Sequence, residues 1–149
     1  MELTKEWMKQ NAELIKARIP VVFPNIEYNP VVLDKPDILE GHAHMEKLTK
    51  ASEVKGKPIE IPIKIMIMIT VSRNLLELKS IEWGIKTVFI HEICHVVNPK
   101  DPDSVMKLYF PAEWEVWSVM MEKKMLKCSY EMEADQWIKE EGNCKREVK

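Results

Sequence analysis

Isoleucine or valine occupies every second position from residue 61 to residue 71, and this alternation is the strongest constraint on the fold. Successive side chains of a β-strand point to opposite faces, so one face of this segment is apolar throughout. The other face includes Pro62 and Lys64. A proline and a lysine are typical of an edge strand, because an interior strand needs all of its backbone donors. The segment from residue 59 to residue 71 is therefore predicted to be an edge strand packed on a core.

After Ser72 the apolar period changes from two to that of a helix. Helical periods and caps predict helices over residues 3–18, 37–50 with Asp37 as the N-cap, 73–97, 103–110 and 111–141. Apolar triplets between prolines predict short strands at residues 21–23 and 31–33. We therefore expect an α+β fold in one domain over residues 1–149, with a small mixed sheet packed against two or three helices.

The composition limits the class of protein. Hydrophobic residues make up 46% of the chain and charged residues 31%, a balance typical of a folded protein. The formal net charge of −2 gives no reason to expect nucleic acid or an anionic membrane as a partner. A charged N-terminus and the lack of a long apolar run predict a cytoplasmic protein. Three cysteines without CxxC spacing argue against a disulfide framework and a zinc ribbon.

Residues 91–95 read His-Glu-Ile-Cys-His, an HExxH motif inside the apolar part of a predicted helix. Residues four apart share a helix face, so the imidazoles of His91 and His95 can reach one divalent ion. Glu92 then lies beside the open coordination position, where it can take a proton from water. Polar residues in such an apolar run are costly without a partner such as a metal. The motif therefore predicts zinc bound by His91 and His95, with Glu92 as a general base.

The HExxH segment and its uncharged flanks resemble the zincin metallopeptidases. Residues 131–135, Glu-Met-Glu-Ala-Asp, resemble the ExxxD motif of gluzincins, particularly of small soluble archaeal ones. The resemblance implies a zincin-like fold in which an edge strand and a later helix flank the HExxH helix. It also implies that Glu131 completes the zinc site and that Asp135 accepts the spare ring N–H of a zinc histidine. Gluzincins often have a downstream histidine or tyrosine for the oxyanion, and here only Tyr109 and Tyr130 are candidates.

Two other carboxylates compete with Glu131 as the third ligand. Asp101 lies six residues after His95, where metzincins have their last ligand, although Asn98 replaces the usual glycine. Glu115 lies at a thermolysin-like distance but has no aspartate four residues later. The sequence leaves the choice among the three open.

His42 and His44 could be ligands for a second metal, but two residues apart in a predicted helix they would point in different directions, so they are expected to be surface residues. The resemblance implies a zinc-dependent peptidase that acts on a peptide or protein substrate. The alternative is a zinc-binding regulatory or interaction module without turnover. Neither the substrate nor the oligomeric state can be predicted from the sequence.

Overall fold

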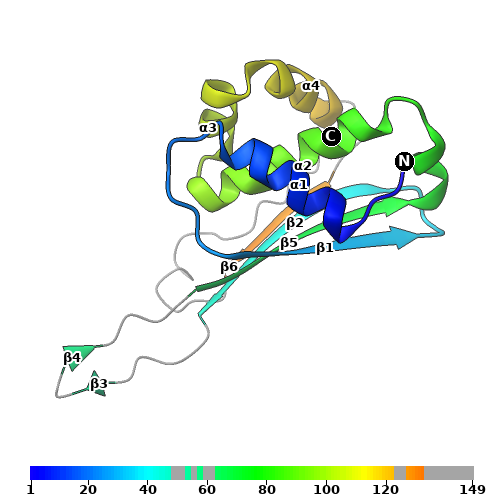
Figure 1. The fold of residues 1–149 in the computed structure, drawn as a ribbon. Coiled ribbons are helices and arrows are strands. Elements are labelled where there is room, and N and C mark those ends of the chain that lie inside the picture. Colours follow the sequence, from blue (N-terminus) through cyan, green and yellow to red (C-terminus); the bar gives the residue numbers. More distant parts are fainter. Residues whose placement is uncertain (48–52, 55–56, 59–62, 123–126, 133–149) are drawn as a thin grey trace.

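The computed structural model describes the chain except for residues 48–52, 55–56, 59–62, 123–126 and 133–149. The fold is α+β, and the helices lie on one side of a four-stranded sheet (Figure 1). The helical elements are α1 (Lys5–Lys16), η1 (Arg73–Glu77), α2 (Ile81–Val97), α3 (Pro102–Tyr109) and α4 (Pro111–Glu122). The strands are β1 (Ile26–Leu33), β2 (Leu39–Lys47), β3 (Glu53–Val54), β4 (Lys57–Pro58), β5 (Ile63–Ser72) and β6 (Lys127–Met132).

The sheet has the order β1-β5-β2-β6, so β5 is an interior strand. It runs parallel to β1 and antiparallel to β2, and β6 runs parallel to β2. The prediction of an edge strand was therefore wrong. Lys64 is tolerated because it lies near the start of β5, is exposed, and forms a 3.7 Å ion pair with Glu27 of β1. Pro62 lies outside the described residues.

Strand β2 occupies most of the segment predicted to be the helix 37–50, and that prediction was wrong. Its odd-numbered positions from Leu39 to Met45 are buried against the helices, and the even-numbered positions are half-buried on the other face. Two of the buried residues are Gly41 and Ala43, which contribute little to an apolar pattern. Of the two short strands predicted, residues 31–33 lie within β1, whereas residues 21–23 form no strand.

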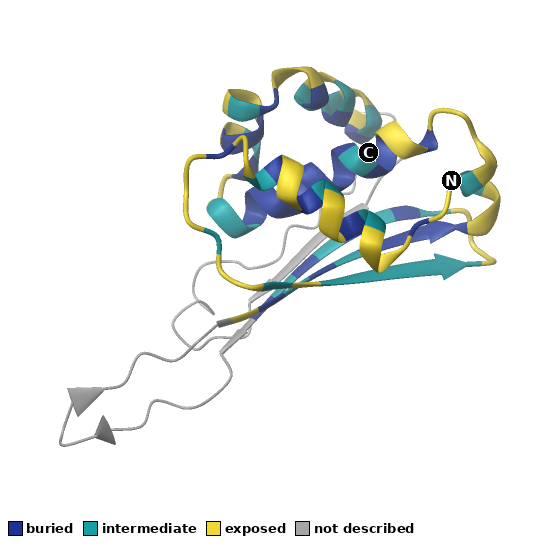
Figure 2. Ribbon diagram, in the orientation of Figure 1, coloured by how far each residue is buried: buried dark blue, intermediate teal, exposed yellow. Residues whose placement is uncertain are grey.

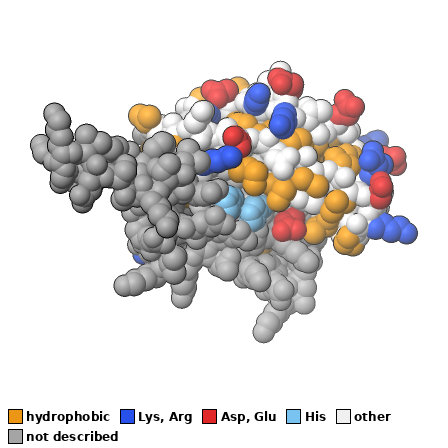
Figure 3. All heavy atoms as spheres, turned by 90° about the horizontal axis from the view of Figure 1, so that it is seen from below, with side chains coloured by type: hydrophobic (Ala, Val, Ile, Leu, Met, Phe, Trp, Pro, Cys, Tyr) orange, Lys and Arg blue, Asp and Glu red, His pale blue; other side chains and the backbone are white. Residues whose placement is uncertain are grey.

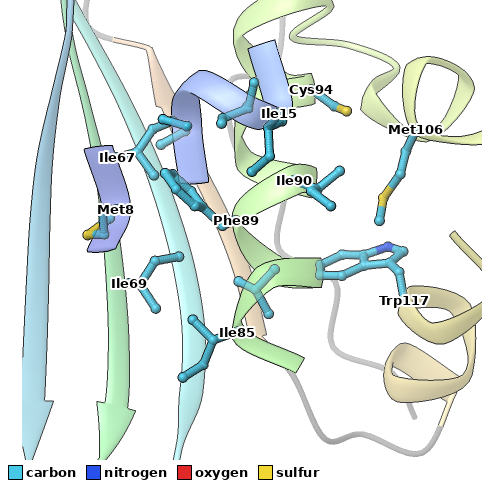
Figure 4. Packing of buried hydrophobic residues seen from close by; sticks show 14 of the residues in the cluster. Met8, Ile15, Ile67, Ile69, Ile85, Phe89, Ile90, Cys94, Met106 and Trp117 are labelled. Atoms are coloured by element: carbon cyan, nitrogen blue, oxygen red, sulfur yellow. The ribbon is translucent and has the colours of Figure 1, made fainter. Parts of the chain in front are cut away.

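Helix α2 is the centre of the core and is buried on almost every side (Figure 2). Toward the sheet, Ile85 and Phe89 face Ile67 and Ile69 of β5 (Figure 4). On its other side, α2 packs against α3 and α4, where Trp117 is buried. A helix that is apolar all round is stable only when other elements cover each face, and here the sheet and the remaining helices do so. None of the described helices is both long and apolar enough to cross a membrane.

The later helices were predicted in part. A helix was expected over residues 103–110, and α3 covers 102–109, with Asp101 as its N-cap. Helix α4 begins at Pro111, as expected for a proline in the first turn, but ends at Glu122. The prediction that this helix extends to residue 141 was wrong over residues 127–132, which form β6 beside β2. The predicted ligand-bearing helix is thus replaced by a strand at residue 131.

Candidate metal centre

The HExxH segment forms the last turns of α2, so His91 and His95 lie one turn apart on the same side of the helix. Their ring centroids are 4.7 Å apart and the rings are nearly perpendicular, at 89°. One possible ligand atom from each of His91, Glu92 and His95 lies within 4.8 Å of the other two. All three side chains are buried, with at most 1% of each residue exposed. The predicted motif residues therefore form one compact polar group inside the core.

The turn that ends α2 orients His95. Asn98 is the C-cap in an extended conformation, and the chain then passes through Pro99. The Nδ1 atom of His95 lies 3.3 Å from the backbone oxygen of Pro99. Because a carbonyl oxygen only accepts hydrogen bonds, this contact is a hydrogen bond in the neutral form of His95 that carries its proton on Nδ1. That is the tautomer that a metal-binding histidine needs.

His91 is held by residues from α3 and α4. Its Nδ1 atom lies 3.7 Å from Oδ1 of Asp103, in the first turn of α3. Its ring stacks on the indole of Trp117, with a centroid distance of 3.8 Å and an interplanar angle of 14°. A nearby carboxylate favours the proton on Nδ1, and the stacking fixes the plane of the ring. Asp103 is thus a described carboxylate beside Nδ1 of His91, at ion-pair distance, whereas Asp135, to which the resemblance assigned this role, lies outside the described residues.

Strand β2 packs directly against the side chain of Glu92. A Cβ atom at Gly41 would lie 2.6 Å from Cγ1 of Val88 and 2.8 Å from both Cγ and Oε1 of Glu92. Both distances are shorter than real contacts allow, so only glycine permits α2 to approach β2 this closely. The carboxylate of Glu92 therefore rests directly on the main chain of the sheet.

The donor set fits a divalent cation. Two imidazoles one helical turn apart and a carboxylate between them in the sequence are ligands that zinc and similar ions accept. A carboxylate as deeply buried as that of Glu92 is costly unless a cation or hydrogen-bond donors compensate its charge. Cys94 is also buried, and burial, together with Glu92 and Asp103, raises the pKa of its thiol above the ordinary range. A protonated thiol is a poor metal ligand, so Cys94 does not compete with the histidines.

Among the described residues, the two rival ligands Asp101 and Glu115 are not members of this group. Asp101 is exposed, and its carboxylate accepts hydrogen bonds from the backbone and the hydroxyl of Ser104, as the N-cap of α3. Glu115 is exposed on α4. Residue 131 lies in β6, in register with His44, and its side chain lies outside what the structure describes. Asp135 also lies outside the described residues.

Several residues around the motif were not predicted from the sequence. Asp103 follows Asp101 by two positions, and an acidic residue in the first turn of a helix has an ordinary explanation in the helix dipole. Trp117 was interpreted as a packing residue, and its contact with His91 depends on how α4 folds back over α2. Gly41 offered a weak signal, since an isolated glycine between apolar positions is typical of close backbone approach.

The chain was compared with known proteins in three ways. No protein-family model matches it. No curated protein sequence and no solved structure matches it at the significance required. The geometry of the buried group is therefore the basis for a proposal about function.

Proposed function

We propose that this protein is a zinc-dependent peptidase in which His91 and His95 bind the metal and Glu92 is the general base. The observation that supports the proposal is the buried group itself, whose possible ligand atoms lie within 4.8 Å of one another. The Nδ1 atom of each ring lies beside an oxygen, of Asp103 or of Pro99, and a partner of this kind orients a metal-binding histidine. Neutral imidazoles oriented in this way are the most common zinc ligands of hydrolytic sites.

Zinc in this position would polarise a scissile carbonyl and lower the pKa of a water molecule to near neutrality. Glu92 takes the proton from that water and later delivers it to the leaving amine. The close approach of Gly41 to Glu92 limits the space into which this carboxylate can move on the side of the sheet. The zincin resemblance implies Glu131 as the third protein ligand, whereas the register of β6 pairs residue 131 with His44; the proposal therefore rests on His91, Glu92 and His95. Asp103 acts through His91, since it lies beside the metal-binding group and is not a member of it.

A second function is favoured by the burial of the site. His91, Glu92 and His95 are each exposed by 1% or less, so a peptide can reach them only after part of the covering chain moves. A protein that never opens in this way would use the metal to stabilise its fold and would act as a binding or regulatory module. In that case Glu92 can serve as a third ligand, because its oxygen lies within the same 4.8 Å limit.

The Glu92→Gln variant separates the two functions. If the protein is a peptidase, the variant retains zinc and its cleavage of an unfolded protein substrate falls on the order of 1,000-fold. If the protein is a binding module in which Glu92 is a ligand, neither form cleaves and the variant binds zinc more weakly. Glu82→Gln is the matched control, because Glu82 is an exposed residue near the start of the same helix. Elemental analysis and proteolysis are measured on all three proteins.

The peptidase proposal is overturned if wild-type protein with about one equivalent of zinc cleaves no substrate, including casein and a random peptide library. It is also overturned if Glu92→Gln cleaves at the rate of Glu82→Gln. Zinc that stays bound in a variant lacking both His91 and His95 would reject the metal centre itself.

A further inference from the structure

The face of the sheet that is turned away from α2 carries a second pair of histidines. Along β2, the side chains of Leu39, Ala43 and Met45 are buried on the helical side, so His42 and His44 lie on the opposite face. Both are half-buried. Their rings are stacked, with centroids 6.2 Å apart and planes inclined by 17°. In a strand, residues two apart point the same way, so this pair can converge on one ligand.

Two methionines of β5 lie directly beside these histidines. The antiparallel register pairs His42 with Met68 and His44 with Met66. Residues paired in this way have Cβ atoms only about 5 Å apart and lie on the same face of the sheet. Both methionines are half-buried, in contrast to the isoleucines that alternate with them, Ile65, Ile67 and Ile69, which are buried in the core. Two imidazoles and two thioethers thus occupy the corners of one small patch.

The sulfur atom of Met68 has one described contact on this face. The Sδ atom of Met68 lies 3.8 Å from Nδ2 of Asn29, which is its partner on β1 and donates a weak hydrogen bond to it. That contact keeps the sulfur on the face of the sheet that is turned away from α2. Methionine has three rotatable bonds, so exchange of this weak contact for another ligand costs little. Figure 3 shows histidine side chains reaching the surface of this side of the molecule, near hydrophobic ones.

We propose that His42, His44, Met66 and Met68 form a binding site for a soft monovalent metal ion, Cu(I) in the cell. Thioether sulfur is a soft ligand that binds Cu(I) and is a weak ligand for zinc, calcium or magnesium. Imidazole nitrogen also binds copper well. A set of two nitrogens and two sulfurs therefore selects copper from the common divalent ions.

This site is independent of the proposed peptidase. The two histidine pairs are on opposite sides of the sheet, and α2 covers only the side that carries Gly41 and Ala43. The sequence neighbours of the two pairs also differ, since Glu92 lies in the same group as His91 and His95, whereas β5 pairs methionines with His42 and His44. Copper binding at the sheet can therefore fail while zinc binding in the core succeeds, and the reverse also holds.

The test uses Ag(I), which has the ligand preferences of Cu(I) and needs no reductant. The full chain is first saturated with zinc, and Cys128 and Cys144 are replaced by serine so that these thiols do not bind silver. Cys94 is left in place because it is buried. The ten methionines are labelled with ¹³C in the methyl group and followed by NMR during the titration. We expect the resonances of Met66 and Met68 to shift and to saturate at about one equivalent of silver.

Matched variants assign the effect. The double variant Met66→Leu/Met68→Leu keeps the volume and apolarity of the side chains but removes both sulfurs, and silver binding should weaken on the order of 100-fold. The double variant His42→Asn/His44→Asn should weaken it to a similar extent. Met120→Leu is the control, since Met120 is a half-buried methionine on α4. Circular dichroism verifies that each variant is folded.

The proposal is overturned if silver leaves the two resonances unchanged in folded protein, or if Met66→Leu/Met68→Leu binds silver as tightly as Met120→Leu does. It is also overturned if one equivalent of zinc at the His42 and His44 pair prevents silver from binding. That outcome would identify the pair as a site for divalent ions.

Discussion

The two histidine pairs of this protein differ in every property that decides what a pair can do. His91 and His95 are four residues apart on a helix, buried, and flanked by a carboxylate. His42 and His44 are two residues apart on a strand, half-buried, and flanked by thioethers. In both pairs the spacing matches the period of the element, so the two rings point in one direction. The comparison shows that two histidines can converge on one ligand only when the number of residues between them matches the period of the helix or strand that carries them.

The neighbours decide what each pair binds. In the core, Asp103 and Pro99 orient the rings and a buried carboxylate adds negative charge, which favours a divalent ion. On the sheet face turned away from α2, the partners on β5 are methionines, whose neutral sulfur atoms favour a soft ion of lower charge. The following predictions test this division of roles.

Replacement of His95 by alanine should have the largest effect. The variant loses a zinc ligand and a buried polar contact, so its bound zinc should fall from about one equivalent to none. At zinc concentrations 1,000-fold above the wild-type dissociation constant, the free energy of unfolding should be about 4 kcal/mol lower than that of the wild type, because zinc no longer binds and stabilises the folded state. Elemental analysis and thermal unfolding, with and without a chelator, measure both quantities. His42→Asn/His44→Asn should retain the zinc, and its loss there would erase the distinction between the pairs.

Asp103→Asn should weaken zinc binding about 10- to 100-fold, because the carboxylate that favours the Nδ1 proton of His91 loses its charge. The matched variant is Asp101→Asn, two residues away. Asparagine caps a helix as well as aspartate does, so this variant should keep both its stability and its zinc affinity. Competition with a fluorescent zinc chelator gives the two affinities. Equal weakening in both variants would contradict a specific role for Asp103.

Gly41→Ala should destabilise the protein by about 1–3 kcal/mol, because the new methyl group overlaps Val88 and Glu92. It should also displace Glu92 and reduce any peptidase activity. Gly84→Ala is the matched control: its Cβ would lie 3.3 Å from Cε of Met120, at the end of a flexible side chain. Within helix α2 this change should be neutral or stabilise the protein by up to about 1 kcal/mol. Urea denaturation of both variants checks the sign, and a stable Gly41→Ala protein would show that α2 can move.

The smallest effect is expected for His42→Asn/His44→Asn in the absence of metal. The two side chains are half-buried on the open face of the sheet, so the free energy of unfolding should change by less than about 1 kcal/mol. Urea denaturation in the presence of a chelator measures it. A change of several kcal/mol would mean that this pair, like the one in α2, belongs to the hydrophobic core.

The elements with strong local signals could be predicted from the sequence. The amphipathic period over residues 3–18 corresponds to α1, which Thr4 caps through a hydrogen bond from the backbone of Trp7. The HExxH helix, the short helix after it and the start of α4 at Pro111 were also predicted. Caps, prolines and apolar periods act within a few residues, so they are legible in a single sequence. The three motif residues of the candidate site were likewise predicted and do lie together.

The features that depend on distant contacts could not be predicted. Strand β2 has glycine and alanine at buried positions because α2 lies so close to it. These small residues hide the apolar alternation by which a strand is predicted from the sequence. Lys64 indicated an edge, yet Glu27 of a neighbouring strand compensates its charge in the interior of the sheet. The end of α4 and the beginning of β6 are set by pairing with β2, far away in the sequence. For the same reason, the contact of Asp103 with His91 has no signature of its own.

The close approach at Gly41 has a consequence for how this centre can evolve and be engineered. Glu92 rests on main chain, which has no rotamers, so the surface beneath the carboxylate cannot be reshaped by exchanging one side chain for another. Variation must come instead from the helices that contact His91, which are α3 with Asp103 and α4 with Trp117. A designer who wishes to tune this metal centre should therefore leave β2 untouched and vary α3 and α4.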